Sequence, residues 1–114
     1  MFTTLDLKTV EVADERRGVR YSARGHVELR GTRGGVAGDL INISASGAAI
    51  RCYGAVFTGA EYTIDIAGLG NFPCTIVRTF SGHCYGVRFN IGFERLKRLD
   101  KRLTEMFADK DASR

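Results

Sequence analysis

The sequence predicts a mainly β protein: a small six-stranded antiparallel barrel followed by one C-terminal amphipathic α-helix. Three observations lead to this fold. Short β-forming segments recur between about residues 20 and 90 with glycine-containing turns between them. A chain of 114 residues supports one modest core, and a closed barrel leaves no exposed sheet edge. After Asn90 the spacing of apolar residues changes from two to three or four.

Six segments carry the strand signal. Residues 26–30 and 62–66 alternate polar and apolar side chains most clearly, and residues 47–53 form a strand of mostly small residues. The segments 68–71 and 81–83 contain glycine and polar residues, which favour hairpin connections. The six predicted strands are 26–30, 36–43, 47–53, 62–66, 74–78 and 85–89.

The last segment is predicted to be a helix over about residues 91–109. Its apolar residues recur at helical spacing, so we expect this stripe to pack on the barrel. They are Phe93, Leu96, Leu99, Leu103, Met106 and Phe107. The basic residues between them are expected to form a solvated face, with a binding surface for an acidic partner as the alternative. These are Arg95, Lys97, Arg98, Lys101 and Arg102.

One domain accounts for the whole chain. We expect an N-terminal arm over residues 1–14, which forms an isolated or exchanged strand or is mobile, and a domain over residues 15–114. No segment approaches the roughly 20 apolar residues that span a bilayer, so no membrane span is expected. The N-terminus has no charged region followed by an apolar run, which argues against a secretory signal. The expected location is the cytoplasm.

The residues that could support catalysis or bind a metal are few. The chain has two histidines, and no catalytic triad, phosphate-binding loop or paired carboxylates stand out. Its three cysteines include no CxxC pair and lie among apolar neighbours, which is typical of small buried side chains in a reducing compartment. We therefore expect no enzymatic activity, no metal and no cofactor.

The basic residues point to recognition of a ligand. The chain holds 13 arginines against 4 lysines, and Arg16, Arg17 and Arg20 lie within five positions. A guanidinium group can donate two parallel hydrogen bonds to a phosphate or to the edge of a guanine. The segment 42–47 adds a turn in which Asn42 and Ser44 offer hydrogen-bonding groups, while Gly47 allows close backbone approach or a positive φ. Together the two segments suit a ligand with phosphate and purine groups.

These residues resemble the signature of the PilZ domain family, the cytoplasmic bacterial receptors for cyclic di-GMP. Arg16 and Arg20 match its RxxxR segment, and Arg17 matches a common adjacent arginine. The downstream [D/N]xSxxG turn is matched by Asn42, Ser44 and Gly47. The resemblance extends from about residue 15 to 90. It implies a six-stranded barrel with the arginine segment folding over cyclic di-GMP, which all six residues would contact.

The resulting hypothesis is a non-enzymatic receptor and adaptor. Cyclic di-GMP would draw the segment 16–20 against the turn 42–47 and alter the binding of an unidentified effector protein in motility, biofilm or polysaccharide control. Two alternatives remain. One is a PilZ-like protein-interaction domain that binds no nucleotide. The other is a small barrel that binds RNA or single-stranded DNA, which is disfavoured because few aromatic residues are interleaved with the arginines.

Overall fold

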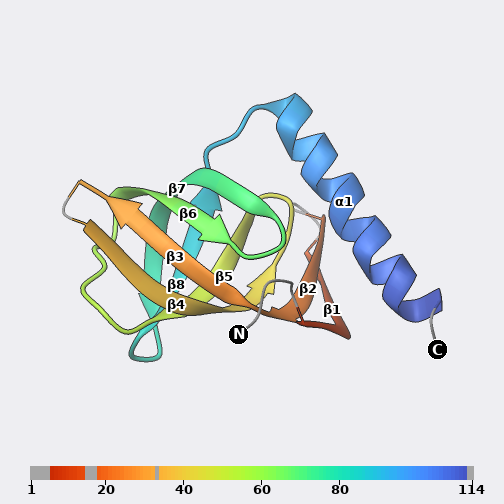
Figure 1. Ribbon diagram of the computed structural model, residues 1–114, viewed down its shortest axis with the longest axis horizontal. Coiled ribbons are helices and arrows are strands. Elements are labelled where there is room, and N and C mark those ends of the chain that lie inside the picture. Colours follow the sequence, from red (N-terminus) through yellow and green to blue (C-terminus); the bar gives the residue numbers. More distant parts are fainter. Residues whose placement is uncertain (1–5, 15–17, 33, 113–114) are drawn as a thin grey trace.

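The computed structural model describes residues 6–14, 18–32 and 34–112, which form eight strands and one helix (Figure 1). The bounds are β1 Asp6–Asp14, β2 Gly18–Arg24, β3 His26–Gly31, β4 Gly34–Ile43, β5 Gly47–Cys52, β6 Glu61–Ile66, β7 Gly70–Phe80, β8 Cys84–Phe89 and α1 Phe93–Ala112. Every strand pairing is antiparallel. The predicted mainly β fold with a C-terminal helix is confirmed.

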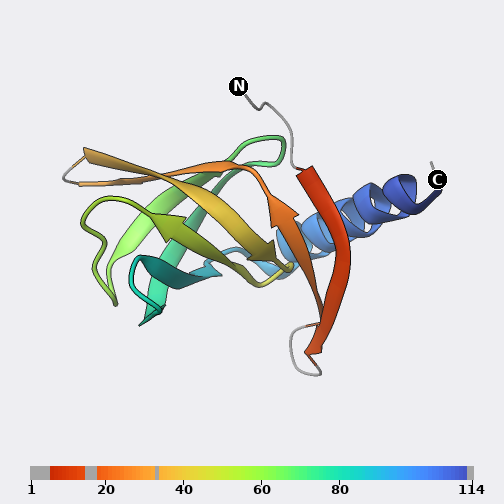
Figure 2. The same cartoon turned by 90° about the horizontal axis from the view of Figure 1, so that it is seen from below.

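Strands β3 to β8 form the closed barrel. Their order around the ring is β4-β3-β6-β7-β8-β5, and β5 pairs back with β4 to close it. Each of these six strands overlaps one of the six predicted segments, so the predicted six-stranded barrel is confirmed. Strand β7 is longer than the predicted segment 74–78 and begins inside the predicted connection 68–71. The remaining strands, β1 and β2, pair with each other and join the ring through β2 and β4. Figure 2 shows this hairpin standing at one end of the barrel.

The barrel interior is filled by alternate residues from its strands. In β3, for example, Val27 and Leu29 are buried, while the residues beside them are exposed or half-buried. Burying one such side chain stabilises the fold by about 1.5–3 kcal/mol. Cys52 and Cys74 lie in this core, as predicted, and burial raises the pKa of their thiols to about 11 and about 12. Both are therefore protonated and unreactive at neutral pH.

The strand register is interrupted at two places that matter for the outer surface. One irregularity lies in β4 between Leu40 and Asn42, and the other lies in β7 between Ile76 and Arg78. A bulge of this kind changes the direction of the side chains that follow it. Asn42 and Arg78 both follow a bulge, and both lie on the outer face of the barrel wall.

Helix α1 packs against the hairpin between β6 and β7 and also contacts β1 (Figures 1 and 2). Leu99 and Leu103 are buried in the main hydrophobic cluster and Met106 packs against it, which confirms the predicted packing for this part of the apolar stripe. Phe93 is instead 71% exposed, and the side chain of Phe107 lies outside the described part of the structure. The Arg95 guanidinium lies 4.7 Å from the centre of the Phe72 ring, and Arg95 also donates to the carbonyl of Asn71. The expected solvated face is thus wrong for Arg95, because a cation can pack on an aromatic ring while it bonds to the backbone.

Within the part of the chain that the structure describes, no helix is both long enough and apolar enough to cross a membrane.

Candidate functional site

The pairing of β2 with β4 brings the two predicted ligand-binding segments together. Tyr21 lies opposite Ile43, and Ser22 lies opposite Asn42. Arg20 comes just before these pairs, and its Nη1 donates a hydrogen bond of 2.7 Å to Oδ1 of Asn42. This bond joins residues 22 positions apart in the sequence. Arg16 and Arg17 lie outside the described residues.

Ser44 has a structural role in the turn between β4 and β5. Its side chain is only 1% exposed. The hydroxyl oxygen accepts a bond from the Ser46 backbone N–H at 3.3 Å and lies 3.2 Å from the Ser46 hydroxyl. The Ser44 backbone N–H donates to the Gly47 carbonyl at 2.8 Å. Ser44 therefore shapes the turn in this conformation.

Gly47 is required by the packing of β5 against β8. A Cβ atom at this position would lie 2.2 Å from the carbonyl oxygen of Val87, far inside van der Waals contact. Gly47 is not among the described glycines with positive φ. Of the two reasons that the sequence suggests for this glycine, close backbone approach is therefore correct, and the neighbour is β8.

Beside the turn, a row of small residues lies on the outer side of the barrel wall, where Ala49 is 7% exposed and Gly86 is buried. Asn42 pairs with Ala49, Ala49 with Gly86, and Gly86 with Arg78, across β4, β5, β8 and β7. Strands in a sheet lie about 4.8 Å apart, so the Cα atoms of Asn42 and Arg78 are about 14 Å apart. Between them, no side chain is larger than the methyl group of Ala49. We call the surface formed by Ala49 and Gly86 the shelf.

Arg78 lies across the far end of the shelf. A Cβ atom built on Gly86 would lie 3.2 Å from Cγ and 3.3 Å from Nε of Arg78, so the arginine side chain covers this glycine. Its guanidinium carbon is 5.4 Å from the centre of the Phe80 ring. The shelf thus has Arg20 and Asn42 at one end and a second, exposed arginine at the other.

A parallel row of polar groups runs next to the shelf. Asp39 pairs with Arg51, and Arg51 with Cys84. Hydrogen bonds to Cys84 and Tyr53 raise the pKa of Arg51, and the Tyr53 hydroxyl donates to Asp39 at 3.1 Å. Sequence reasoning did not select Arg51 or Arg78, because they join the site only through the register of neighbouring strands. The small residues Gly47, Ala49 and Gly86 are visible in the sequence, but their position next to Arg78 follows only from the strand register.

The comparison with known families decides what kind of domain this is. The sequence model of the PilZ domain matches residues 14–105, which include both segments of the candidate site and the full barrel. This chain belongs to the PilZ domain family. PilZ domains are a family of cyclic di-GMP receptors.

A solved PilZ domain has the same architecture. The match is titled "Crystal structure of PilZ domain of CeSA from cellulose synthesizing bacterium", with 22% sequence identity and a TM-score of 0.56. The alignment covers 75% of this chain and 97% of that chain. At this level of identity the likeness shows the shared fold. A comparison with curated protein sequences gives no match.

In the described part of this PilZ domain, no three His, Cys, Asp or Glu side chains gather in a way that could hold a metal ion. The described groups that converge at the candidate site are instead a guanidinium, an amide, backbone groups of a tight turn and the shelf. Such a set can bind a planar, anionic ligand by hydrogen bonds and surface contact.

Proposed function

We propose that this PilZ domain is a non-enzymatic receptor for cyclic di-GMP, bound where β2 meets the turn between β4 and β5. The observation that carries the proposal is the 2.7 Å hydrogen bond from Arg20 to Asn42. It holds a guanidinium beside the turn. Binding then costs less conformational entropy, because part of the arginine geometry is already set.

In this proposal the residues of the two motifs divide into two groups. Arg16, Arg17 and Arg20 supply charge-assisted bonds to phosphates and to the Hoogsteen edge of guanine. Asn42 orients Arg20 and presents its amide to the ligand. Ser44 and Gly47 act mainly by fixing the turn, since the hydroxyl of one is bonded inside it and the other packs on Val87.

The shelf adds a surface for the rest of the ligand. Ala49 is 7% exposed and Gly86 lies beneath the Arg78 side chain, so a purine ring would reach this part of the wall by displacing that side chain. Arg78 at its far end is suitably placed for the second phosphate or the second guanine of a cyclic dinucleotide. We infer that the ligand spans from Asn42 to Arg78 along the row of paired residues.

Ligand binding at this place would be communicated through the β1–β2 hairpin, because β2 carries Arg20 and β1 contacts α1. An effector protein that reads the position of the hairpin or the helix would respond to cyclic di-GMP. The domain then acts as an adaptor in cyclic di-GMP signalling, with motility, biofilm or polysaccharide control as the proposed outputs and the cytoplasm as the proposed location.

Isothermal titration calorimetry with cyclic di-GMP tests the proposal. We expect binding by the wild-type chain and a loss of about tenfold or more, or about 1.4 kcal/mol, in each of the variants Arg16→Ala, Arg20→Ala and Asn42→Ala. Arg30→Ala, which removes an exposed arginine from β3, is the matched control and should bind normally. Absence of binding by the wild type would refute the receptor function. Normal binding by the three site variants would instead refute the assigned site.

A single-stranded oligonucleotide of random sequence distinguishes the nucleic-acid alternative. Binding through phosphates alone weakens steeply with salt and shows no preference for a cyclic dinucleotide. Tight oligonucleotide binding that cyclic di-GMP does not displace would favour that alternative.

A further inference from the structure

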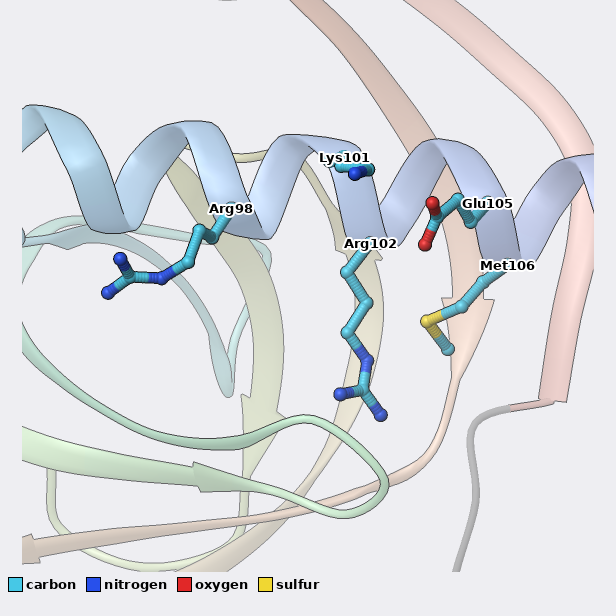
Figure 3. A pocket seen from close by; sticks show the side chains of 5 residues that line it. All are labelled: Arg98, Lys101, Arg102, Glu105 and Met106. Atoms are coloured by element: carbon cyan, nitrogen blue, oxygen red, sulfur yellow. The ribbon is translucent and has the colours of Figure 1, made fainter.

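A groove runs along α1 on the side of the helix that faces the hairpin between β6 and β7. Figure 3 shows the side chains that line it. They are Arg98, Lys101, Arg102, Glu105 and Met106. Three carry positive charge and one carries negative charge, so the lining is basic. We call the groove lined by these five residues the basic groove.

The groove has a defined shape because two elements fix its walls. Arg102 crosses it and donates to the carbonyl oxygen of Gly68 at 2.9 Å. Gly68 has a φ of 88°, a left-handed conformation that glycine adopts readily and that belongs to the turn between β6 and β7. On the helix side, Leu103 is 1% exposed and fixes the rotation of α1 on the barrel. The exposed cations Arg98 and Lys101 are therefore held on one face.

The chemistry of the lining selects a kind of ligand. Residues three and four positions apart share a helix face, so Arg98, Lys101 and Arg102 present their charges in one strip. Met106 is half-buried, packs on the core and offers an adaptable apolar contact beside this strip. None of the described residues that line the groove is aromatic, whereas surfaces that bind single-stranded nucleic acid stack bases on aromatic rings.

We propose that the basic groove docks an extended acidic segment of a partner protein, with an apolar residue of that segment against Met106. Charge complementarity with Arg98 and Lys101 supplies attraction and orientation, and Met106 supplies a desolvated contact. None of the lining residues belongs to the candidate cyclic di-GMP site. This docking surface therefore stands or falls independently of nucleotide binding.

The test uses the full chain and a short fluorescein-labelled peptide of aspartate and glutamate with one central leucine. Fluorescence anisotropy at low ionic strength should show saturable binding. Arg98→Glu combined with Lys101→Glu should weaken it about tenfold or more. The matched control, Arg30→Glu combined with Arg24→Glu, has the same net charge but changes exposed arginines of β3 and β2, and it should weaken binding by less than about threefold. Thermal unfolding checks that both double variants are folded.

A second comparison separates a docking site from general attraction between charges. Replacing the leucine of the peptide by serine should weaken binding to the wild type about threefold or more, and should have little effect on binding to Met106→Ala. Equal losses in the two double variants, or equal effects of the serine peptide on wild type and Met106→Ala, would overturn the proposal. Displacement of the peptide by a single-stranded oligonucleotide at lower concentration than by unlabelled peptide would also overturn it.

Discussion

Because Gly86 has no side chain, the side chain of Arg78 can lie over it. The arginine lies flat because Gly86 has no side chain to lift it, and a methyl group there would approach its Cγ at 3.2 Å. An arginine held flat on a sheet presents the edge of its guanidinium along the surface. This is the direction in which a ligand on the shelf would meet it.

We predict that Arg78→Ala weakens cyclic di-GMP binding about tenfold or more, since a hydrogen bond to a charged group contributes about 1.5–3 kcal/mol. Gly86→Ala should reduce affinity as well, because it displaces the same side chain. Calorimetry measures both effects, with Arg30→Ala as the control. If Arg78→Ala binds like the wild type, the ligand does not reach the far end of the shelf.

The role of Gly47 in packing β5 against β8 can be tested by measuring the stability of the domain. We predict that Gly47→Ala destabilises the domain by about 1–3 kcal/mol, because the added methyl group collides with the Val87 carbonyl and the two strands must move. Urea unfolding followed by circular dichroism measures the loss. Gly92→Ala is the matched control, since a Cβ atom there meets nothing within 4 Å and the φ of Gly92 is not positive. Equal stability of the two variants would contradict this explanation of Gly47.

At the scale of a secondary-structure element, helix α1 is attached to the barrel by both apolar and polar contacts. Its attachment combines buried leucines with two arginines that donate to the carbonyls of Gly68 and Asn71. We predict that Leu103→Ala lowers the free energy of unfolding by about 2–5 kcal/mol, as for other leucines removed from a packed core. Lys101→Ala, two positions away and exposed, should change it by less than about 0.5 kcal/mol. Chemical denaturation compares the two, and similar values would mean that α1 contributes little to the core.

The sequence predicts some of these elements and contacts and not others. The six barrel strands follow from alternation and the hairpins from their turn residues, because both signals are local. The pairing of β2 with β4 is not local, so the contact between Arg20 and Asn42 could be anticipated only from the family resemblance. The shelf and Arg78 depend on the register of four strands and on two bulges, for which the chain carries no clear local signal.

At the scale of the whole molecule, the buried thiols make stability depend on pH. The pKa values of Cys52 and Cys74 are raised to about 11 and about 12, above the value of 9.0 for an exposed thiol. The unfolded chain therefore loses these protons first as pH rises, and their contribution to stability, present below pH 9, declines between about pH 9 and 12. We predict a lower free energy of unfolding at pH 10 than at pH 8.

Urea denaturation at the two pH values measures this difference. Cys74→Ala should show a smaller pH dependence than the wild type, even though the lost side chain lowers its stability at both values. An unchanged pH dependence in this variant would mean that the Cys74 thiol does not cause the effect.

The short pairing between β2 and β4 affects how easily the β1–β2 hairpin separates from the barrel. Two residue pairs, Tyr21 with Ile43 and Ser22 with Asn42, join the β1–β2 hairpin to a ring that is otherwise closed on itself, and the hairpin is also held by the Arg20–Asn42 bond and by the contact of β1 with α1. We expect this hairpin to open more readily than the closed ring, so that its amide protons exchange with solvent through that partial opening. A ligand that contacts both β2 and β4 would hold the hairpin on the barrel. Exchange in β2 would then require unfolding of the entire barrel, so the amide protons of one strand would report whether the ligand is bound.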